Sequence, residues 1–333
     1  MRWGLIGAST IASQHVIGAI RATGGTVVAV MSTHQARAED FATAHGIGVA
    51  LSQLDDLLTL PGIAAVYISS TNEKHFAQTM AALNAGKHVL CEKPLAMTTG
   101  QAAEMVALAD GKGLVLATNH HLRCSGSHRA IRDLVASGRI GQVLSLRIFH
   151  AVHLPQSLQG WRINDAAVGG GVIPDITVHD ADVARFILGE DPLTVVAQAG
   201  TSGLGQGVED SAMSIWTMPS GAMVQSHESF THPFAGSGLE LHGTLGSVFA
   251  RGVMTQVPLG EIELVTAAGR EAIPFPTHDL YAQGLQDFQA AVAGLGRPAA
   301  TGQDGVASLA VALAVREAAR TGTRQTVDYG KAA

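Results

Sequence analysis

The chain has 333 residues, 47% hydrophobic and only 14% charged, which excludes a disordered protein and leaves room for two domains. The net charge of -6 offers no basic surface for nucleic acid, and two cysteines, Cys91 and Cys124, cannot form a disulfide framework, so a reducing cytoplasm is expected. No signal peptide is expected, and the longest mostly apolar run near the end, Val306–Val315, is too short to cross a membrane.

Short apolar runs alternate with helical patterns in the first part of the chain, as they do in βαβ units. The expected strands are Trp3–Ile6, Thr26–Met31, Ala65–Ser69, His88–Cys91 and Leu114–Ala117. The helices between them are expected to end near Ile20, Ala44, Ala85 and Ala109. This rhythm predicts an α/β N-terminal domain with a doubly wound parallel sheet, which is a Rossmann domain.

Consecutive strands replace this alternation from His121 onward. The expected strands are Val143–Val152, Thr194–Ala199, Ser211–Met218, Ala222–Phe230, Leu239–His242, Ser247–Ala250 and Glu261–Thr266. Helices are expected at His128–Ala136, after the glycines at 169–171, and at the end of the chain, about Leu280–Ala293 and Gly305–Ala319. We predict an α+β C-terminal domain with an open, mostly antiparallel sheet. The predicted domains are 1–119 and 120–333, with the option that the two last helices pack back on the first domain.

The turn after the first strand, Gly7-Ala8-Ser9-Thr10-Ile11-Ala12, stands where a dinucleotide fingerprint is expected. The usual fingerprint has three glycines, with alanine tolerated at the last position, so this version is degenerate and weak by itself. Gly7 can still form the tight turn, and Ala12 is small enough for close packing of helix and strand. The start of the helix favours an anion, and the hydroxyl of Ser9 is available to a phosphate.

The end of the second strand distinguishes NAD from NADP. NAD enzymes usually place an acid there, which binds the ribose hydroxyls. This chain has Ser32 and Thr33, with Arg37 soon after and no acid before Glu39. Hydroxyls and an arginine bind the 2′-phosphate that an acid would repel, so NADP(H) is predicted over NAD(H). The alternative is that Arg37 is a solvated helix residue, as most arginines are.

Glu92-Lys93-Pro94 follows a core strand at its carboxyl end, where ligands of open α/β sheets bind. A lysine there can polarise a substrate oxygen, and in a partly dry cleft its pKa would tend to fall, which helps it share a proton. By position alone, an ordinary surface lysine is the more common interpretation. The sequence does not fix whether the bond before Pro94 is cis.

Asp175 and His179 are four residues apart and share one helical face, provided that Pro174 lies in the first turn. A carboxylate beside an imidazole orients it, and such a histidine can protonate an alkoxide as hydride arrives. The alternative is a solvated polar stripe. Zinc is not expected, because Asp175, His179, His120 and His121 lack the spacing of a strong metal motif.

These segments together resemble the glucose–fructose oxidoreductase/inositol dehydrogenase family over essentially the whole chain. They are Gly7–Ala12, Ser70-Thr71-Asn72-Glu73-Lys74-His75, Ala85–Val89 with Glu92-Lys93-Pro94, and Gly169–His179. The resemblance implies that Lys93, His179 and Asp175 are catalytic: His179 as proton donor, Lys93 as polariser of the carbonyl oxygen, Asp175 as orienter and substrate ligand. Many relatives dimerise through the open sheet, so a monomer or a homo-oligomer through that sheet is expected. Pro174 departs from the family, which usually has a larger apolar residue there.

A narrower resemblance, to a reductase branch of that family, rests on Trp3–Ile11, Thr118–Arg123, Gln159–Arg162 and Asp175–Asp182. It implies a small-molecule sugar substrate, with NADPH-dependent reduction of the ketone of 1,5-anhydro-D-fructose to 1,5-anhydro-D-mannitol. Carried over residue by residue, cofactor contacts are expected at Gly7, Ala8, Ser9, Thr10, Ile11, Ser32, Thr33, Arg37, Ser70, Thr71, Asn72, Glu73, Lys74, His75, Glu92, Lys93, Asn119, Trp161, Arg162 and Tyr281.

Two other functions remain open at this stage. An enzyme of the same family acting on another sugar or an inositol would share the catalytic group, so the motifs do not exclude it. A dinucleotide-responsive binding protein without turnover is a more distant alternative, and the presence of Lys93, Asp175 and His179 together argues against it.

Overall fold

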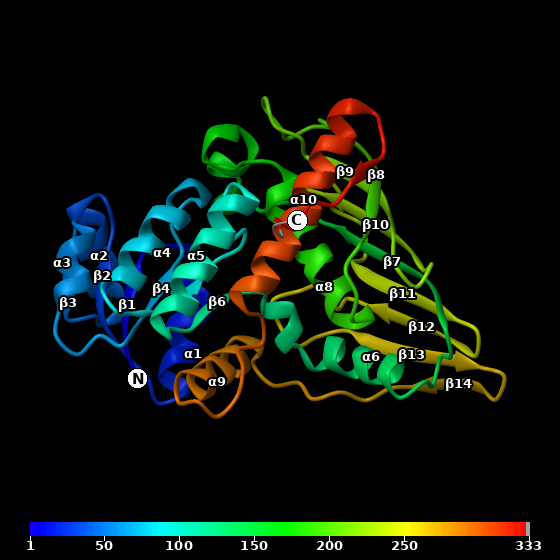
Figure 1. Cartoon of the computed structure of the whole chain (residues 1–333), viewed down its shortest axis with the longest axis horizontal. Helices are drawn as coiled ribbons and strands as arrows, with labels where there is room; N and C mark the ends of the chain where they lie inside the picture. Colours follow the sequence, from blue (N-terminus) through cyan, green and yellow to red (C-terminus); the bar gives the residue numbers. More distant parts are fainter. Residues whose placement is uncertain (331–333) are drawn as a thin grey trace. The chain divides into compact units, whose positions relative to one another are not determined.

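The computed structural model describes residues 1–330, which form two compact units (Figure 1). Unit 1 contains Met1–His120 and Tyr281–Val306, and unit 2 contains His121–Leu280 and the residues from Ala307 onward. The second boundary between the units falls inside helix α10 (Gly302–Thr321). Among the described residues, no helix is long and apolar enough to cross a membrane.

Unit 1 is built on a six-stranded parallel sheet, which confirms the predicted doubly wound domain. Its strands are β1 (Arg2–Ile6), β2 (Thr26–Met31), β3 (Val49–Leu51), β4 (Ala65–Ile68), β5 (His88–Cys91) and β6 (Leu116–Thr118). Their spatial order is β3-β2-β1-β4-β5-β6, so the direction of winding reverses between β1 and β4. Ligands of such sheets bind outside the carboxyl ends of the strands at this reversal.

Most helices of unit 1 lie between its strands along the chain, and α9 (Leu280–Val292) comes from the later segment of the unit. The helices are η1 (Ala12–Val16, a π-helical turn), α1 (Ile17–Ala22), α2 (Gln35–His45), α3 (Leu54–Thr59), η2 (Asn72–Lys74), α4 (His75–Asn84), α5 (Thr99–Lys112) and α9. The ring of Phe288 on α9 packs 5.2 Å from that of Trp3 on β1, and both side chains are fully buried. A segment near the end of the chain therefore completes the core of the first unit.

Unit 2 contains a nine-stranded sheet, and the predicted open, mostly antiparallel arrangement is confirmed. Its strands are β7 (Val143–Ala151), β8 (Thr194–Gly200), β9 (Ser211–Thr217), β10 (Met223–Ser229), β11 (Gly238–Gly243), β12 (Gly246–Arg251), β13 (Glu261–Thr266), β14 (Gly269–Ala272) and β15 (Gln325–Thr326). The order is β14-β13-β12-β11-β7-β10-β9-β8-β15, and β7 and β10 form the parallel pair. Period-two alternation on β9 buries Ala212, Ser214 and Trp216 and leaves Met213 and Ile215 about half exposed.

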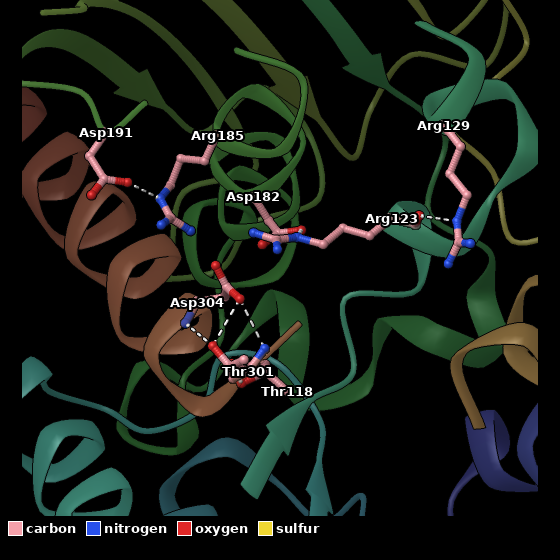
Figure 2. Close-up of polar contacts among 8 residues, drawn as sticks. All are labelled: Thr118, Arg123, Arg129, Asp182, Arg185, Asp191, Thr301 and Asp304. Carbon is pink, nitrogen blue, oxygen red and sulfur yellow. Dashed lines mark hydrogen bonds and ion pairs between the residues drawn. The ribbon is translucent and has the colours of Figure 1, made fainter. Parts of the chain in front are cut away.

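The helices of unit 2 are η3 (His121–Cys124), α6 (Gly126–Ala136), α7 (Gln156–Gln159), η4 (Gly160–Ile163), η5 (Ala166–Val168), η6 (Ile173–Thr177), α8 (Val178–Leu188) and the second part of α10. Among them, α6, η6 and α8 pack on the nine-stranded sheet and contribute to its core. Two ion pairs hold α8 in place: Arg123 Nε lies 2.7 Å from Asp182 Oδ2, and Arg185 Nε lies 2.6 Å from Asp191 Oδ1 (Figure 2).

One buried carboxylate, that of Asp210, organises the loop after β8. It accepts hydrogen bonds from the backbone of Ser202 at 2.7 Å, Gly203 at 3.0 Å, Leu204 at 2.7 Å and Gly205 at 2.8 Å. Burial alone would raise the pKa of Asp210, but these N–H groups and the Ser202 hydroxyl outweigh it and lower the pKa to about 2. The negative charge of Asp210 therefore holds the loop at 202–205 through these hydrogen bonds.

We expect this charge to make folding stability depend on acid. Because the folded pKa of Asp210 lies below its ordinary value of 3.8, its contribution is complete at neutral pH and is lost as the pH falls towards 2. Asp210→Asn should lower the free energy of unfolding at pH 7 by about 1–3 kcal/mol, and less at pH 3. Urea unfolding at both pH values measures this, with the exposed Asp56→Asn as control. An Asp210→Asn effect of the same size at both pH values would contradict the account.

Candidate active site

The turn after β1 depends on a glycine. Gly7 has φ +113°, and a Cβ placed there would lie 2.9 Å from the backbone of Ser69 and Ser70. The missing side chain lets the turn after β1 approach the end of β4. A backbone this close to the switch point of the sheet is the feature that lets a phosphate reach a helix start.

Ser9 replaces a glycine of the usual fingerprint and has a structural role of its own. Its hydroxyl accepts a hydrogen bond from the N–H of Ala12 at 3.2 Å and donates to Ser69 Oγ at 2.7 Å. Ala12 is fully buried, as close packing of the helix on the sheet requires. The serine therefore caps the first turn of the helix and ties it to β4.

The end of β2 carries no carboxylate. Ser32 is nearly buried, whereas Thr33 and Arg37 are exposed. The Arg37 Nη2 donates to the carbonyl of Ala8 at 2.8 Å, so the guanidinium lies against the Gly7 turn. The next acid along the chain is Glu39, whose Oε1 accepts a hydrogen bond from Gln35 Nε2 on the same helix at 2.9 Å.

The segment after β4 is held by local hydrogen bonds. Ser70 Oγ donates to Gln78 Oε1 at 2.6 Å, Thr71 Oγ1 donates to Glu73 Oε1 at 2.8 Å, and Lys74 Nζ lies 3.7 Å from the same Glu73 oxygen. Asn72, in the same segment, is nearly buried.

His75 connects this segment to the turn after β5. Its ring is fully buried, and its Nδ1 and Nε2 lie 2.8 Å and 3.2 Å from the carbonyl oxygens of Pro94 and Ser70. Burial lowers the pKa of His75, so the ring is neutral at pH 7 and donates one hydrogen at a time. The His75 ring therefore links the Ser70 segment to Pro94 and helps to fix the turn that carries Lys93.

The Glu92-Lys93-Pro94 turn is fixed on its other side through Glu92. Its Oε1 accepts hydrogen bonds from Tyr67 Oη and from Asn119 Nδ2, both at 2.6 Å. Burial, and then the Glu92 charge, raise the pKa of Tyr67 well above its ordinary value, so the phenol remains a donor. The bond between Lys93 and Pro94 is cis, and Lys93 is half-buried. Tyr281, the last predicted cofactor contact in this unit, is 4% exposed and stacks on His15 with ring centroids 4.7 Å apart.

In unit 2, the helix of Asp175 and His179 begins with a π-helical turn, η6, and continues as α8. Pro174 lies in the first turn, where its missing N–H costs no helical hydrogen bond, as the sequence predicted. The N–H of Ile173 donates to Glu209 Oε1 at 3.2 Å, so a side chain caps this end. A π-helical turn is uncommon and is often found at functional sites.

The glycines before this helix bring a loop against Asp175. A Cβ on Gly170 would lie 2.5 Å from the carbonyl oxygen of Trp161, and Gly171 N–H donates to the carbonyl of Arg162 at 2.8 Å. Arg162 Nε consequently lies 3.5 Å from Asp175 Oδ1, and its guanidinium stacks over the Trp161 ring at 4.6 Å. Three residues predicted for the site therefore meet in this unit.

His179 lies near two other imidazoles, those of His121 and His150. It is 7% exposed, its ring lies edge-on to that of His121 with centroids 4.9 Å apart, and His150 lies 6.4 Å away. Among residues 1–330, no three His, Cys, Asp or Glu side chains are placed to hold a metal ion.

The sequence analysis missed three polar residues near this helix: His150, whose ring lies 6.4 Å from that of His179, Asp180, and Glu228, which interacts with Asp180. A signal was present, because the buried face of β10 carries Val224, Ser226 and Glu228 in strict alternation. An acid at an inward-facing position is rarely buried without a partner. That pattern could have indicated a polar cluster inside the second domain.

Solved structures with this fold extend over the whole chain. An aldose-aldose oxidoreductase from Caulobacter crescentus, complexed with glycerol, has a TM-score of 0.89 at 24% identity and covers 98% of this chain and 99% of its own. A levoglucosan dehydrogenase in complex with NADH and levoglucosan has a TM-score of 0.88 at 22% identity, with the same coverage. At these identities the likeness shows the fold.

The sequence comparisons identify the family. A 1,5-anhydro-D-fructose reductase of Ensifer adhaerens is 53% identical over 330 residues, which cover 99% of each chain. Residues 1–120 match the oxidoreductase family with an NAD-binding Rossmann fold, and residues 128–249 match the GFO/IDH/MocA C-terminal domain. The chain therefore belongs to the GFO/IDH/MocA family of oxidoreductases, the glucose–fructose oxidoreductase/inositol dehydrogenase family that its motifs resemble, and its cofactor is a nicotinamide dinucleotide.

Proposed function

We propose that this protein is a cytoplasmic sugar oxidoreductase that uses NADPH to reduce the ketone of 1,5-anhydro-D-fructose to 1,5-anhydro-D-mannitol. The observation that carries this proposal is the 53% identity with the Ensifer adhaerens reductase over 99% of both chains. Unit 1 would be the dinucleotide-binding domain and unit 2 the substrate domain. The narrow turn at Gly7, with its helix start behind, fits a dinucleotide phosphate.

Lys93, His179 and Asp175 each have a separate role in the proposed reduction. NADPH, when bound, supplies the hydride for the carbonyl carbon. Lys93 donates a hydrogen bond to the carbonyl oxygen and stabilises the negative charge that develops there. His179 gives its ring proton to that oxygen, which becomes the new hydroxyl. Asp175, held by Arg162 at 3.5 Å, accepts a hydrogen bond from a substrate hydroxyl and fixes the sugar.

We propose the cofactor contacts that the family resemblance implies. The residues of unit 1 that would bind the cofactor are Gly7, Ala8, Ser9, Thr10, Ile11, Ser32, Thr33, Arg37, the segment Ser70–His75, Glu92, Lys93, Asn119 and Tyr281, and those of unit 2 are Trp161 and Arg162. Because the rings of His75 and Tyr281 are buried, we assign them the support of neighbouring contacts. Ser9 and Glu92 would contribute mainly by shaping the turns that their hydrogen bonds hold.

The choice of NADPH over NADH is the step tested most directly by substitution. Ser32→Asp with Arg37→Ala places a carboxylate where the 2′-phosphate would lie and removes its cation. We expect the ratio of kcat/KM for NADPH to that for NADH to fall at least about tenfold, because a hydrogen bond to a charged group contributes about 1.5–3 kcal/mol. Arg21→Ala, at an exposed arginine on the same unit, is the control. An unchanged ratio would remove Ser32 and Arg37 from the phosphate site.

Substrate identity is tested by following NADPH consumption with 1,5-anhydro-D-fructose, beside NADH and a panel of keto-sugars and inositols. Rapid turnover with NADPH on anhydrofructose alone is the expected result, and the product should be 1,5-anhydro-D-mannitol. Turnover only on another polyol, or only with NADH, would replace the substrate or the cofactor in the proposal and leave the family and the fold unaffected.

A further inference from the structure

Three ionisable side chains meet inside unit 2 beside His179, and no step of the reduction above uses them. His150 at the end of β7 and Glu228 on β10 are direct neighbours in the register of that parallel pair. Asp180, on α8, accepts a hydrogen bond from His150 Nδ1 at 2.8 Å. We call His150, Asp180 and Glu228 the buried acid cluster.

Ser226 shows how the cluster must be protonated. Its Oγ lies 3.2 Å from Asp180 Oδ2 and within hydrogen-bond distance of Glu228 Oε1. One hydroxyl has one hydrogen, so it cannot donate to two carboxylates at once. A proton on Glu228 removes the conflict, because Glu228 then donates to one of its oxygen neighbours.

Burial leads to the same assignment. Asp180, Ser226 and Glu228 are all fully buried, and two neighbouring carboxylates in such a place cannot both be ionised. Burial, and then the Asp180 charge, raise the pKa of Glu228 well above its ordinary value. The cluster thus contains a neutral Glu228 and one carboxylate, Asp180, which faces His150.

His150 links this carboxylate to the proposed proton donor. Its side chain is 13% exposed, and its ring centroid lies 6.4 Å from that of His179. One water molecule can bridge two rings at this separation. Asp180 lies 2.8 Å from His150 Nδ1 and so fixes the orientation of the ring, as a carboxylate behind an imidazole does in other enzymes.

We propose that His150 returns a proton to His179 after each turnover, and that Asp180 and Glu228 hold His150 in this role. The proposal rests on the proposed reduction, in which His179 gives its proton to the new hydroxyl. An N–H bond of the His150 imidazolium breaks, the bridging water passes a proton on, and an N–H bond forms at His179. His150 then takes a proton from solvent, so the charge of the cluster is restored.

The histidines His128 and His227 near His150 do not compete for this proton. Burial, and to a lesser extent His150 itself, lowers the pKa of His128 on α6 to about 3, so His128 stays neutral. Burial, and then His232, lowers the pKa of His227 on β10, whose ring packs on Phe149. His121 lies edge-on to His179 and extends the same group of imidazoles.

The test is His150→Asn, whose amide can still donate to Asp180 but cannot carry a proton. We expect kcat on the keto-sugar to fall about tenfold, less than for loss of a direct proton donor, with KM unchanged. Added imidazole should restore part of the loss in a concentration-dependent way, which a purely structural defect would not show. His242→Asn, at a histidine on β11 whose Nδ1 lies 2.9 Å from Ser247 Oγ on β12, is the matched control. A wild-type kcat in His150→Asn would overturn the relay.

A readout independent of turnover separates this proposal from the proposed function. Imidazole NMR should show His150 and His179 titrating as a coupled pair in the resting protein, and His179 titrating in a single step in His150→Asn. Asp180→Asn should have the effect of His150→Asn, with no further loss in the double variant. If His179 titrates identically with and without His150, the relay is wrong, even where the wild type reduces anhydrofructose. If the wild type reduces no sugar but the rings are coupled, the proposed substrate is wrong and the relay stands.

Discussion

Replacing His179 with glutamine is expected to lower kcat for ketone reduction about 10²–10⁴-fold, the usual contribution of a positioned general acid. Glutamine retains a donor near the position of the ring nitrogen, but its amide does not give up a proton. The new alkoxide would then have to take its proton from water. Because His179 is not among the proposed cofactor contacts, NADPH should bind with unchanged affinity.

Stopped-flow measurement of hydride transfer, with NADPH binding followed by fluorescence, separates these two effects. His153→Gln, at an exposed histidine of the same unit, is the control and should retain wild-type kcat. A His179→Gln protein that binds NADPH normally and turns over at the wild-type rate would assign the proton to another group. His121, whose ring lies 4.9 Å away, would then be the first to examine.

The fold was predictable where burial makes a strand a continuous apolar run. β1, β2, β4 and β5 are such runs, and their order along the chain leaves little choice but a doubly wound sheet. β3 was missed because its apolar run, Val49–Leu51, has only three residues, and all three are only half-buried. β14 was missed for a similar reason, since all four of its residues are exposed. Edge strands depend on their neighbours more than on their own composition.

The site was predictable only as far as a motif fixes its residues along the chain. Asp175 and His179 share a helix, so their spacing was informative, and the position of Pro174 in the first turn is confirmed. Glu228 and Asp180 meet through the pairing of β10 with β7 and the packing of α8, which no local pattern encodes. The same holds for the hydrogen bonds of Ser9 to Ala12 and Ser69, which the local sequence does not show; its contact with a phosphate stays a prediction.

Arg123→Met is expected to destabilise unit 2 strongly. Arg123 and Asp182 are both nearly buried, and the guanidinium lies 5.4 Å from the centre of the Phe186 ring. Methionine fills much of the same space but leaves the carboxylate of Asp182 without the cation 2.7 Å away (Figure 2). Removing one partner of a buried pair costs about 3–5 kcal/mol of folding free energy. Urea unfolding of the two proteins measures the difference.

The double variant Arg123→Met with Asp182→Leu tests whether the lost stability comes from the Asp182 carboxylate, which Arg123→Met leaves buried without its cation. Most of the stability should return, because a well-packed apolar pair of similar volume is often as stable as the buried ion pair that it replaces. Arg251→Met, which breaks an exposed pair with Glu261, should cost no more than about 1 kcal/mol. If the double variant is as unstable as Arg123→Met, the lost stability comes from side-chain packing around Phe186. Packing would then contribute more than the ion pair to the position of α8. Because α8 also carries His179, that result would tie the proposed proton donor to the hydrophobic core of unit 2.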